Sequence, residues 1–203
     1  IVSAKVEASN AGYEILKMGG NAFDAMIATD LALAVVYPNA GNLGGGGFMV
    51  YRTNEGNYGS LDFREKAPLA ASKNMYLDEN DKIIKGLSRQ GALSIGVPGT
   101  VAGLFEIYDR FGSLPMDSLF KPALKLAKDG FPLTKKQAKL FNQNKKTILS
   151  NSNNIDLFNK DFKEGTIFSN PSLYYTLKFI LENGKDSFYS GKISEEIVNF
   201  LYS

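Results

Sequence analysis

Arg64 is the residue whose type and setting most clearly allow specific chemistry in this sequence. It ends the alternating run "YGSLDFR" at residues 58–64, in which Leu61 and Phe63 share one face while Asp62 and Arg64 share the other. Because the apolar face packs into the core, we expect Arg64 to project from the polar face of a rigid strand. A guanidinium can bind one carboxylate through two parallel N–H···O bonds, which fixes the orientation of an amino-acid ligand.

A surface ion pair is the simpler interpretation of Arg64. Asp62 and Glu65 flank it in the sequence, and exposed ion pairs of this kind contribute only about 0–1 kcal/mol to stability. The periodicity of the strand does not distinguish a ligand-binding arginine from an ion-paired one. On the residues alone, both interpretations stay open.

Four consecutive glycines at residues 44–47 enter the same predicted hairpin. Phosphate-binding loops follow a strand and lead into a helix, whereas the predicted order here is helix, glycines, strand. No GK[ST] follows and the spacing does not match GxGxxG, so a nucleotide site is disfavoured. We expect these glycines to adopt positive φ angles and to pack closely against a neighbouring element, the buried helix before them. A site lined by their N–H groups, open to a carbonyl oxygen or carboxylate, is the remaining alternative.

The composition narrows the chemistry further. The 203 residues include no histidine and no cysteine, which excludes thiol nucleophiles, disulfides, zinc–thiolate sites and the commonest general base. Catalysis by this chain alone would need Ser, Thr, Lys, Tyr or carboxylates, and no cofactor is expected. The net charge of +2 disfavours nucleic acid and anionic membranes as partners.

The longest apolar segment, residues 22–38, predicts a buried helix. It is shorter than the roughly 20 residues that span a bilayer, and it carries Asp24 and Asp30, so no membrane span is expected in this segment. Asn21 is expected to cap this helix, which should run to about Val36 and be enclosed on nearly all sides. After the glycines, "FMVYRT" and "YGSLDFR" predict a hairpin joined by "NEGN".

The remaining elements follow from capping and stop signals. Helices are predicted at residues 11–20, 101–111, 116–130, 171–183 and 192–203. Ser9 or Asn10 is expected to cap the first of these and Thr100 the second, after a short strand that ends at Pro98. The polar, asparagine-rich segment at residues 134–160 is expected to be a long surface excursion.

Six motifs together carry a resemblance to a known family. They are "GGNAFDAMIA", "GNLGGGGFMVYR", "LDFREKAP", "GVPGTVAGL", "PALKLAKDGF" and "ENGKDSFYSGKISEEI". In this order, and over most of the chain, they resemble the γ-glutamyltransferase (γ-glutamyltranspeptidase) family. The chain begins at Ile1 without a methionine and its last helix has no stop signal, so we expect a trimmed product and a longer parent protein.

The resemblance implies an α+β fold, the four-layer αββα sandwich of the N-terminal nucleophile hydrolases, of which residues 1–203 would be a single domain fragment from the N-terminal part of the large subunit. Family members are proenzymes that process themselves, and a threonine at the new N-terminus of the small subunit attacks the γ-glutamyl carbonyl, with its own α-amino group as base. They cleave glutathione and related γ-glutamyl compounds, and they pass the γ-glutamyl group to water, amino acids or peptides. The threonine motif has no counterpart here, so the small subunit is the expected partner and this chain alone should be inactive.

One family role falls on a residue of this chain. The arginine of the "DFRE" motif binds the α-carboxylate of the γ-glutamyl group, and it corresponds to Arg64. The resemblance also implies a periplasmic or extracellular location. It leaves two alternatives open: a related acylase, of the cephalosporin acylase or poly-γ-glutamate depolymerase type, and a non-catalytic binding module on the same scaffold. The sequence after Ser203 would separate the last of these from an enzyme.

Overall fold

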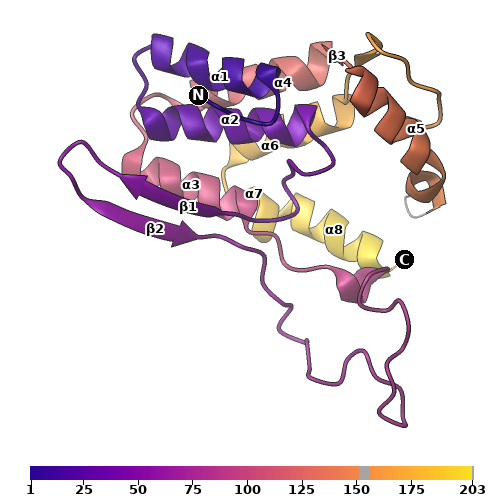
Figure 1. Ribbon diagram of the computed structural model, residues 1–203. Coiled ribbons are helices and arrows are strands. Elements are labelled where there is room, and N and C mark those ends of the chain that lie inside the picture. The colour runs from indigo at the N-terminus through magenta and orange to yellow at the C-terminus, as the bar shows by residue number, and fades with distance from the viewer. Residues whose placement is uncertain (151–155, 203) are drawn as a thin grey trace.

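The computed structural model describes residues 1–150 and 156–202 and is built mainly of helices (Figure 1). The strands form two antiparallel pairs, β1 with β2 and β3 with β4. In the described residues, the helices are all too short or too polar to cross a lipid bilayer. In chain order the elements are α1 (Val6–Lys17), α2 (Ala22–Val36), β1 (Phe48–Arg52), β2 (Tyr58–Asp62), a 3₁₀ turn (Ala92–Ser94), α3 (Thr100–Phe111), α4 (Met116–Asp129), β3 (Phe131–Pro132), α5 (Lys135–Ser150), β4 (Ile167–Phe168), α6 (Pro171–Asn183), α7 (Asp186–Tyr189) and α8 (Lys192–Tyr202).

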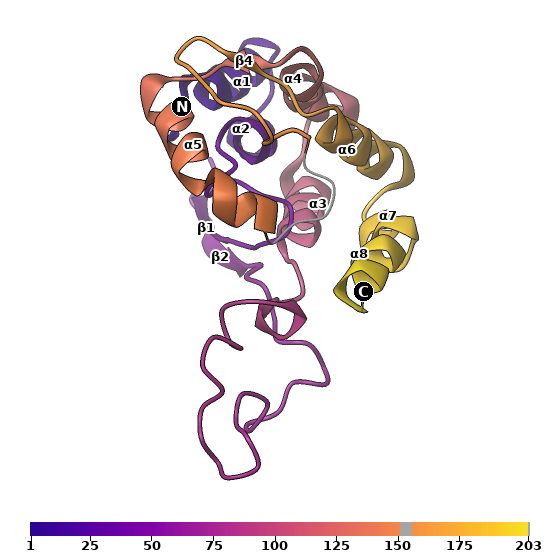
Figure 2. The ribbon, with the colours of Figure 1, turned by 90° about the vertical axis from the view of Figure 1, so that its right-hand side faces the viewer.

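Helix α2 lies at the centre of the helical body and is buried on nearly every side, as predicted. The Asn21 side chain accepts hydrogen bonds from the N–H groups of Phe23 and Asp24 (2.8 and 3.0 Å), and the Asp24 carboxylate accepts one from the Asn21 N–H (3.0 Å). This reciprocal capping satisfies N–H groups that the first turn leaves free. Helices α1, α3 and α4 pack around α2, which Figure 2 shows end-on between α1 and α3.

The β1–β2 hairpin forms as predicted, with Phe48 opposite Asp62 and Arg52 opposite Tyr58. Its inner face packs on the helices: the Tyr51 ring lies 4.8 Å from the Phe111 ring, centroid to centroid. Its outer face is open and mixes polar residues such as Ser60 and Asp62 with exposed apolar ones: Phe48 is 65% exposed, Val50 87% and Tyr58 86%. Within the described residues, neither outer edge of this hairpin pairs with a further strand.

The long surface excursion lies elsewhere than predicted. Residues 66–97 run away from the helical body as an extended loop (Figures 1 and 2), held by short turns, by a bridge between Lys66 and Val97 at its base and by a second bridge between Leu77 and Ile83. The expected strand before Pro98 is reduced to the bridge between Lys66 and Val97. The sequence did not predict this excursion, because residues 66–97 lack a periodic apolar pattern and their turn residues do not indicate how long the loop is.

The segment at residues 134–160 is largely helical instead of an excursion, because α5 occupies most of it. Gln137, Ala138 and Phe141 form a buried face, and the Phe141 ring packs on that of Phe162, 5.3 Å away between centroids. The asparagine bias concealed this face, because the polar residues line the exposed side of the helix. The "NSNN" at residues 151–154 lies outside the described residues.

Two helix starts differ from prediction. Helix α1 begins at Val6, so Ser9 and Asn10 lie inside it and Lys5 is the residue before its first turn. Helix α3 begins at Thr100 itself, with Gly99 in the capping position and no side-chain cap. In both cases the buried face extends the helix backwards past the polar residue that resembled a cap.

The remaining helix boundaries agree with the sequence. The Asn170 side chain caps α6 by accepting a hydrogen bond from the Leu173 N–H (3.0 Å). Gly130 after α4 and Gly184 after α6 have φ of 83° and 75°, the left-handed values that favour glycine. Pro122 lies inside α4. Helix α8 runs to Tyr202, and Ser203 lies outside the described residues.

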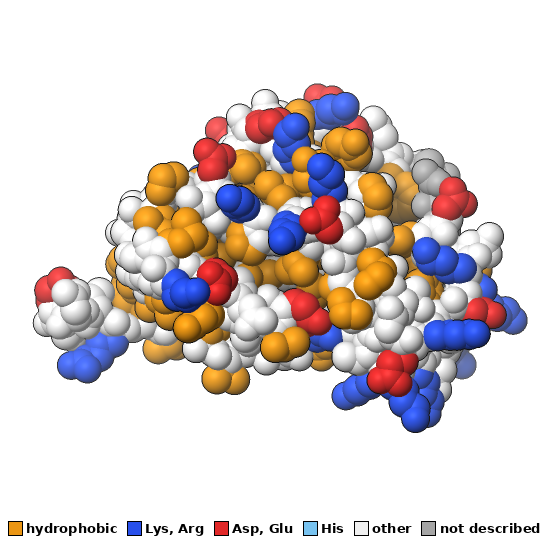
Figure 3. All heavy atoms as spheres, turned by 90° about the horizontal axis from the view of Figure 1, so that it is seen from above, with side chains coloured by type: hydrophobic (Ala, Val, Ile, Leu, Met, Phe, Trp, Pro, Cys, Tyr) orange, Lys and Arg blue, Asp and Glu red, His pale blue; other side chains and the backbone are white. Residues whose placement is uncertain are grey.

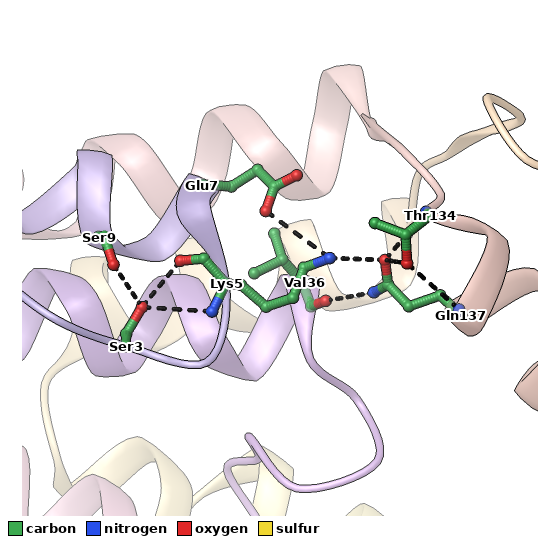
Figure 4. A network of polar contacts seen from close by, with 7 residues as sticks. All are labelled: Ser3, Lys5, Glu7, Ser9, Val36, Thr134 and Gln137. Carbon is green, nitrogen blue, oxygen red and sulfur yellow. Dashed lines mark hydrogen bonds and ion pairs between the residues drawn. The ribbon is translucent and has the colours of Figure 1, made fainter.

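A buried polar network fastens the end of α2 (Figure 4). The Lys5 ammonium donates to Gln137 Oε1 (2.6 Å), and the Gln137 amide donates to the carbonyl of Val36 (2.9 Å). The Glu7 carboxylate lies 3.8 Å from the Lys5 ammonium, which balances its charge. The network joins the N-terminal segment, α2 and α5 at the point where the chain leaves α2 toward the glycine run.

Candidate functional site

Arg64 lies one residue beyond the paired part of the hairpin. The strand was expected to include it, but β2 ends at Asp62. Backbone pairing continues only to Phe63, whose N–H donates to the Gly47 carbonyl (3.0 Å) and whose carbonyl accepts from the Gly47 N–H (3.3 Å). Arg64 therefore begins the long loop, and its position depends on how the preceding residues are held.

The glycine run holds this segment from one side. A Cβ at Gly46 would lie 2.6 Å from Arg64 Cα and 2.6 Å from the Glu65 nitrogen, and a Cβ at Gly47 would lie 2.7 Å from the Phe63 ring. Real Cβ atoms do not approach other atoms so closely, so a side chain at residue 46 would clash with backbone and one at residue 47 would require the Phe63 ring to shift. The predicted close packing is confirmed, but the neighbour is the Arg64 segment instead of the buried helix.

Helix α3 holds the same segment from the other side. A Cβ at Gly99 would lie 2.8 Å from the carbonyl carbon of Phe63, and one at Gly103 would lie 2.7 Å from Phe63 Cβ. The two glycines are four residues apart and so lie on one face of the helix start. Phe63 is thus enclosed by glycines from two segments far apart in the sequence, and we call this arrangement the glycine clamp (Gly46, Gly47, Gly99 and Gly103).

The glycine run also satisfies the N-terminus of α3. The N–H groups of Gly99 and Thr100 donate to the carbonyl of Gly45 (2.7 and 3.0 Å), and the Ala102 N–H donates to the Tyr189 hydroxyl (3.0 Å). These are the N–H groups that a phosphate would otherwise need. The glycine run thus supplies a carbonyl acceptor to the start of α3, whereas a phosphate-binding loop supplies N–H donors to an anion.

The expected backbone conformation of the glycine run is wrong. Positive φ values occur at other glycines, and residues 44–47 are not among them. The close approach to α2 is made by Gly41, whose added Cβ would lie 2.9 Å from the Ala34 nitrogen. The glycines at residues 46 and 47 are required by close packing, not by a left-handed backbone.

The guanidinium of Arg64 is exposed and unpaired within the part of the chain that the structure describes. The ion pair with Asp62 or Glu65, the alternative interpretation of Arg64, is therefore not formed in the described residues. Arg64 lines a pocket of about 330 Å³ together with Glu106 and Lys185. The geometry thus leaves an arginine fork available to an anion at the edge of an open hollow.

Other groups of the described residues support the fold instead of a second site. No group of three or more acidic side chains there could hold a metal ion. Burial raises the pKa of Asp24, but hydrogen bonds from Ser113 and Asn21 outweigh this and lower it below its usual value. Acidic and basic side chains are interspersed on the face shown in Figure 3.

Asp30 on α2 has no hydrogen-bond or ion-pair partner in the described residues, and burial raises its pKa to about 6. Since the folded state binds this proton more tightly than the unfolded state, stability should fall as the pH rises from about 4 through 6. We expect Asp30→Asn to raise the melting temperature at pH 8 and to change it little at pH 4. Thermal unfolding at several pH values measures this, with the exposed Asp109→Asn as control. An equal effect at both pH values would contradict it.

Sequence reasoning singled out Arg64 as a candidate but did not predict the glycine contacts that hold its segment. Phe63 was placed in the core, but its contacts with Gly99 and Gly103 were not predicted because these glycines are distant in the sequence. The spacing of Gly99 and Gly103 by four residues was the available signal, since it places two positions without side chains on one helical face.

Comparisons with known proteins agree with these features. The profile of the gamma-glutamyltranspeptidase family matches residues 8–203. A glutathione hydrolase proenzyme of Pseudomonas sp. strain A14 is 43% identical over 202 residues, which are 98% of this chain and 35% of the relative. The chain thus spans about a third of the length of such curated relatives.

Solved structures extend the agreement to the fold. Helicobacter pylori gamma-glutamyltranspeptidase superposes with a TM-score of 0.92 at 42% identity, covering 97% of this chain and 57% of that chain. A cephalosporin acylase from Bacillus halodurans gives a TM-score of 0.81 at 26% identity, covering 95% and 37%. The family match includes both the glycine run and the segment that bears Arg64, and we conclude that this chain belongs to the gamma-glutamyltranspeptidase family.

Proposed function

We propose that this chain is the N-terminal part of the large subunit of a glutathione hydrolase, and that Arg64 binds the α-carboxylate of the γ-glutamyl group. The observation that carries this is the unpaired guanidinium beside an open pocket, on a backbone fixed by the glycine clamp. A planar fork that is held in place can bind a carboxylate through two hydrogen bonds. Such binding would orient the substrate's γ-carbonyl toward a nucleophile supplied by the rest of the enzyme.

The nucleophile in this proposal is a threonine at the N-terminus of the small subunit, which the self-processing proenzyme would release. Its hydroxyl attacks the γ-carbonyl while its α-amino group takes the proton, and cysteinylglycine leaves when glutathione is the donor. Water or an amino-acid or peptide amine then attacks the γ-glutamyl ester, which regenerates the hydroxyl. Similarity to proenzymes named glutathione hydrolase supports this assignment.

The proposed complete fold is the four-layer αββα sandwich, with residues 1–203 as one domain fragment. The outer face of the β1–β2 hairpin supports it, because Phe48, Val50 and Tyr58 are exposed there on strands whose outer edges are unpaired in the described residues. Large apolar side chains on the face of a sheet are usually buried against another layer. We propose that strands from the rest of the enzyme cover them. An exported location, in the periplasm or outside the cell, is proposed from the family resemblance alone.

To test whether this chain binds the donor while the small subunit supplies the nucleophile, residues 1–203 are compared with the whole enzyme. Purified residues 1–203 should show no hydrolysis of a γ-glutamyl anilide above background, whereas the processed full-length protein should release the aniline. The physical reason is that Arg64 binds the donor but contributes no nucleophile. Turnover by the fragment that disappears when one of its Ser or Thr residues is replaced would refute the proposal.

A related acylase with another donor is the second candidate, favoured by the similarity to the cephalosporin acylase structure. A panel of donors offered to the full-length protein separates the two: glutathione, a γ-glutamyl anilide, poly-γ-glutamate and a glutaryl-cephalosporin. We expect glutathione and the anilide to give the highest kcat/KM. A preference for either of the other donors would assign the second candidate.

A further inference from the structure

Asp62 makes a contact that the proposed binding of substrate does not use. Its carboxylate oxygen Oδ1 accepts a hydrogen bond from the backbone N–H of Arg64 at 2.9 Å. Asp62 is the last residue of β2, and its own backbone is fixed opposite Phe48. The contact therefore runs from the rigid end of the hairpin to the first residue beyond it.

This hydrogen bond is the one restraint on the Arg64 N–H. The hairpin ladder ends at Phe63, whose backbone pairs with Gly47, and the next backbone pairing along the chain is that of Lys66 with Val97. Within the described residues, the Arg64 N–H has Asp62 as its acceptor and forms no other hydrogen bond. The glycine clamp packs against the Arg64 backbone but makes no hydrogen bond to its N–H, so loss of the acceptor would remove the hydrogen bond that sets the orientation of this peptide group.

We propose that Asp62 is a positioning residue, which fixes the backbone at Arg64 so that the guanidinium is aimed at the substrate carboxylate. The inference rests on the proposed role of Arg64. Asp62 acts here through geometry, as a hydrogen-bond acceptor two residues before the group that it orients. Its negative charge is not required, and beside a carboxylate-binding arginine that charge opposes an anionic ligand.

Replacements of Asp62 in the processed full-length enzyme separate geometry from charge. Asp62→Ala removes the acceptor and should raise KM for a γ-glutamyl anilide roughly fivefold, the usual effect of one hydrogen bond, with kcat nearly unchanged. Asp62→Asn keeps an acceptor oxygen without the charge and should restore KM to within about twofold of the parent. Asp62→Thr, a weaker acceptor that keeps strand propensity, should give an intermediate KM.

Two controls complete the design. Ser60→Ala changes the same outer face of β2 where the side chain has no such role, and it should leave KM unchanged. In an Arg64→Ala background, Asp62→Ala should add no further loss, since there is no guanidinium left to orient. Thermal unfolding of each variant shows whether a change in KM results from a loss of folded protein. If Asp62→Ala does not mature, the KM of Asp62→Thr tests the inference in its place.

The outcomes are distinct. Equal KM for Asp62→Ala and the parent would overturn the inference, as would equal losses in Asp62→Ala and Asp62→Asn, which would indicate a role of charge. Additive losses in the double variant would also overturn it. If Arg64→Ala itself leaves KM unchanged, the proposed function fails instead, whatever the Asp62 variants do.

Discussion

Replacing Arg64 by alanine in the full-length enzyme should raise KM for a γ-glutamyl donor about a hundredfold. Under the proposed function, the change removes a charge-assisted, two-bond contact to a carboxylate that substrate and small subunit would enclose. Breaking a buried charge pair of this kind costs about 3 kcal/mol, and each 1.4 kcal/mol is about tenfold in affinity. Initial rates over a range of donor concentrations measure the effect.

The shape of the guanidinium should matter as much as its charge. Arg64→Lys is expected to rescue binding poorly, because an ammonium offers a point charge in place of a planar fork. Arg52→Ala provides a matched control, since Arg52 is an exposed arginine at the other end of the same hairpin. An unchanged KM in Arg64→Ala, or an equal rise in Arg52→Ala, would show that Arg64 does not bind the donor.

Replacing Gly46 by alanine should prevent folding or maturation before it alters affinity. The added Cβ would lie 2.6 Å from both Arg64 Cα and the Glu65 nitrogen, and these backbone atoms cannot move aside as a flexible side chain would. Overpacking typically costs about 1–3 kcal/mol, and contact with fixed backbone places this case at the upper end or beyond. The yield of soluble, processed protein and its thermal unfolding measure the loss.

Gly44 supplies the control within the same run. A Cβ added there meets no atom within 4 Å, so Gly44→Ala should fold and mature as the parent does. If Gly46→Ala instead gives fully processed enzyme of normal stability with a raised KM, the loop itself lines the substrate site. That result would favour the alternative in which the glycine N–H groups face the ligand.

The elements with local signals could be predicted from the sequence. Asn21 and Asn170 each cap a helix from the adjacent turn, and the alternation in β2 correctly placed Leu61 toward the core and Asp62 outward. Features that depend on distant partners could not be predicted. Helix α5 forms because Phe141 packs on other aromatic rings, and the glycine run packs on the Arg64 segment because α3 closes over it from far along the chain.

The candidate site shows the same division. The alternation of polar and apolar residues pointed to Arg64. Only the structure shows that β2 ends at Asp62, before Arg64, and that the guanidinium makes no ion pair in the described residues. The hydrogen bond from the Arg64 N–H to Asp62 spans only two residues and is local, yet charge alone made Asp62 resemble an ion-pair partner. An acidic residue two positions before an arginine can accept a hydrogen bond from the arginine's backbone N–H as well as form an ion pair with its guanidinium.

The open face of the β1–β2 hairpin has a consequence for biosynthesis. Matching relatives are about three times as long as this chain, so ribosomes making such proteins complete the hairpin well before the remaining strands exist. During that interval Val50 and Tyr58, 87% and 86% exposed, lie on strands with bare edges, a combination that invites pairing between nascent chains. If a second layer covers this face in the complete protein, as proposed above, the face stays exposed until that layer is made and is a surface that a chaperone could shield.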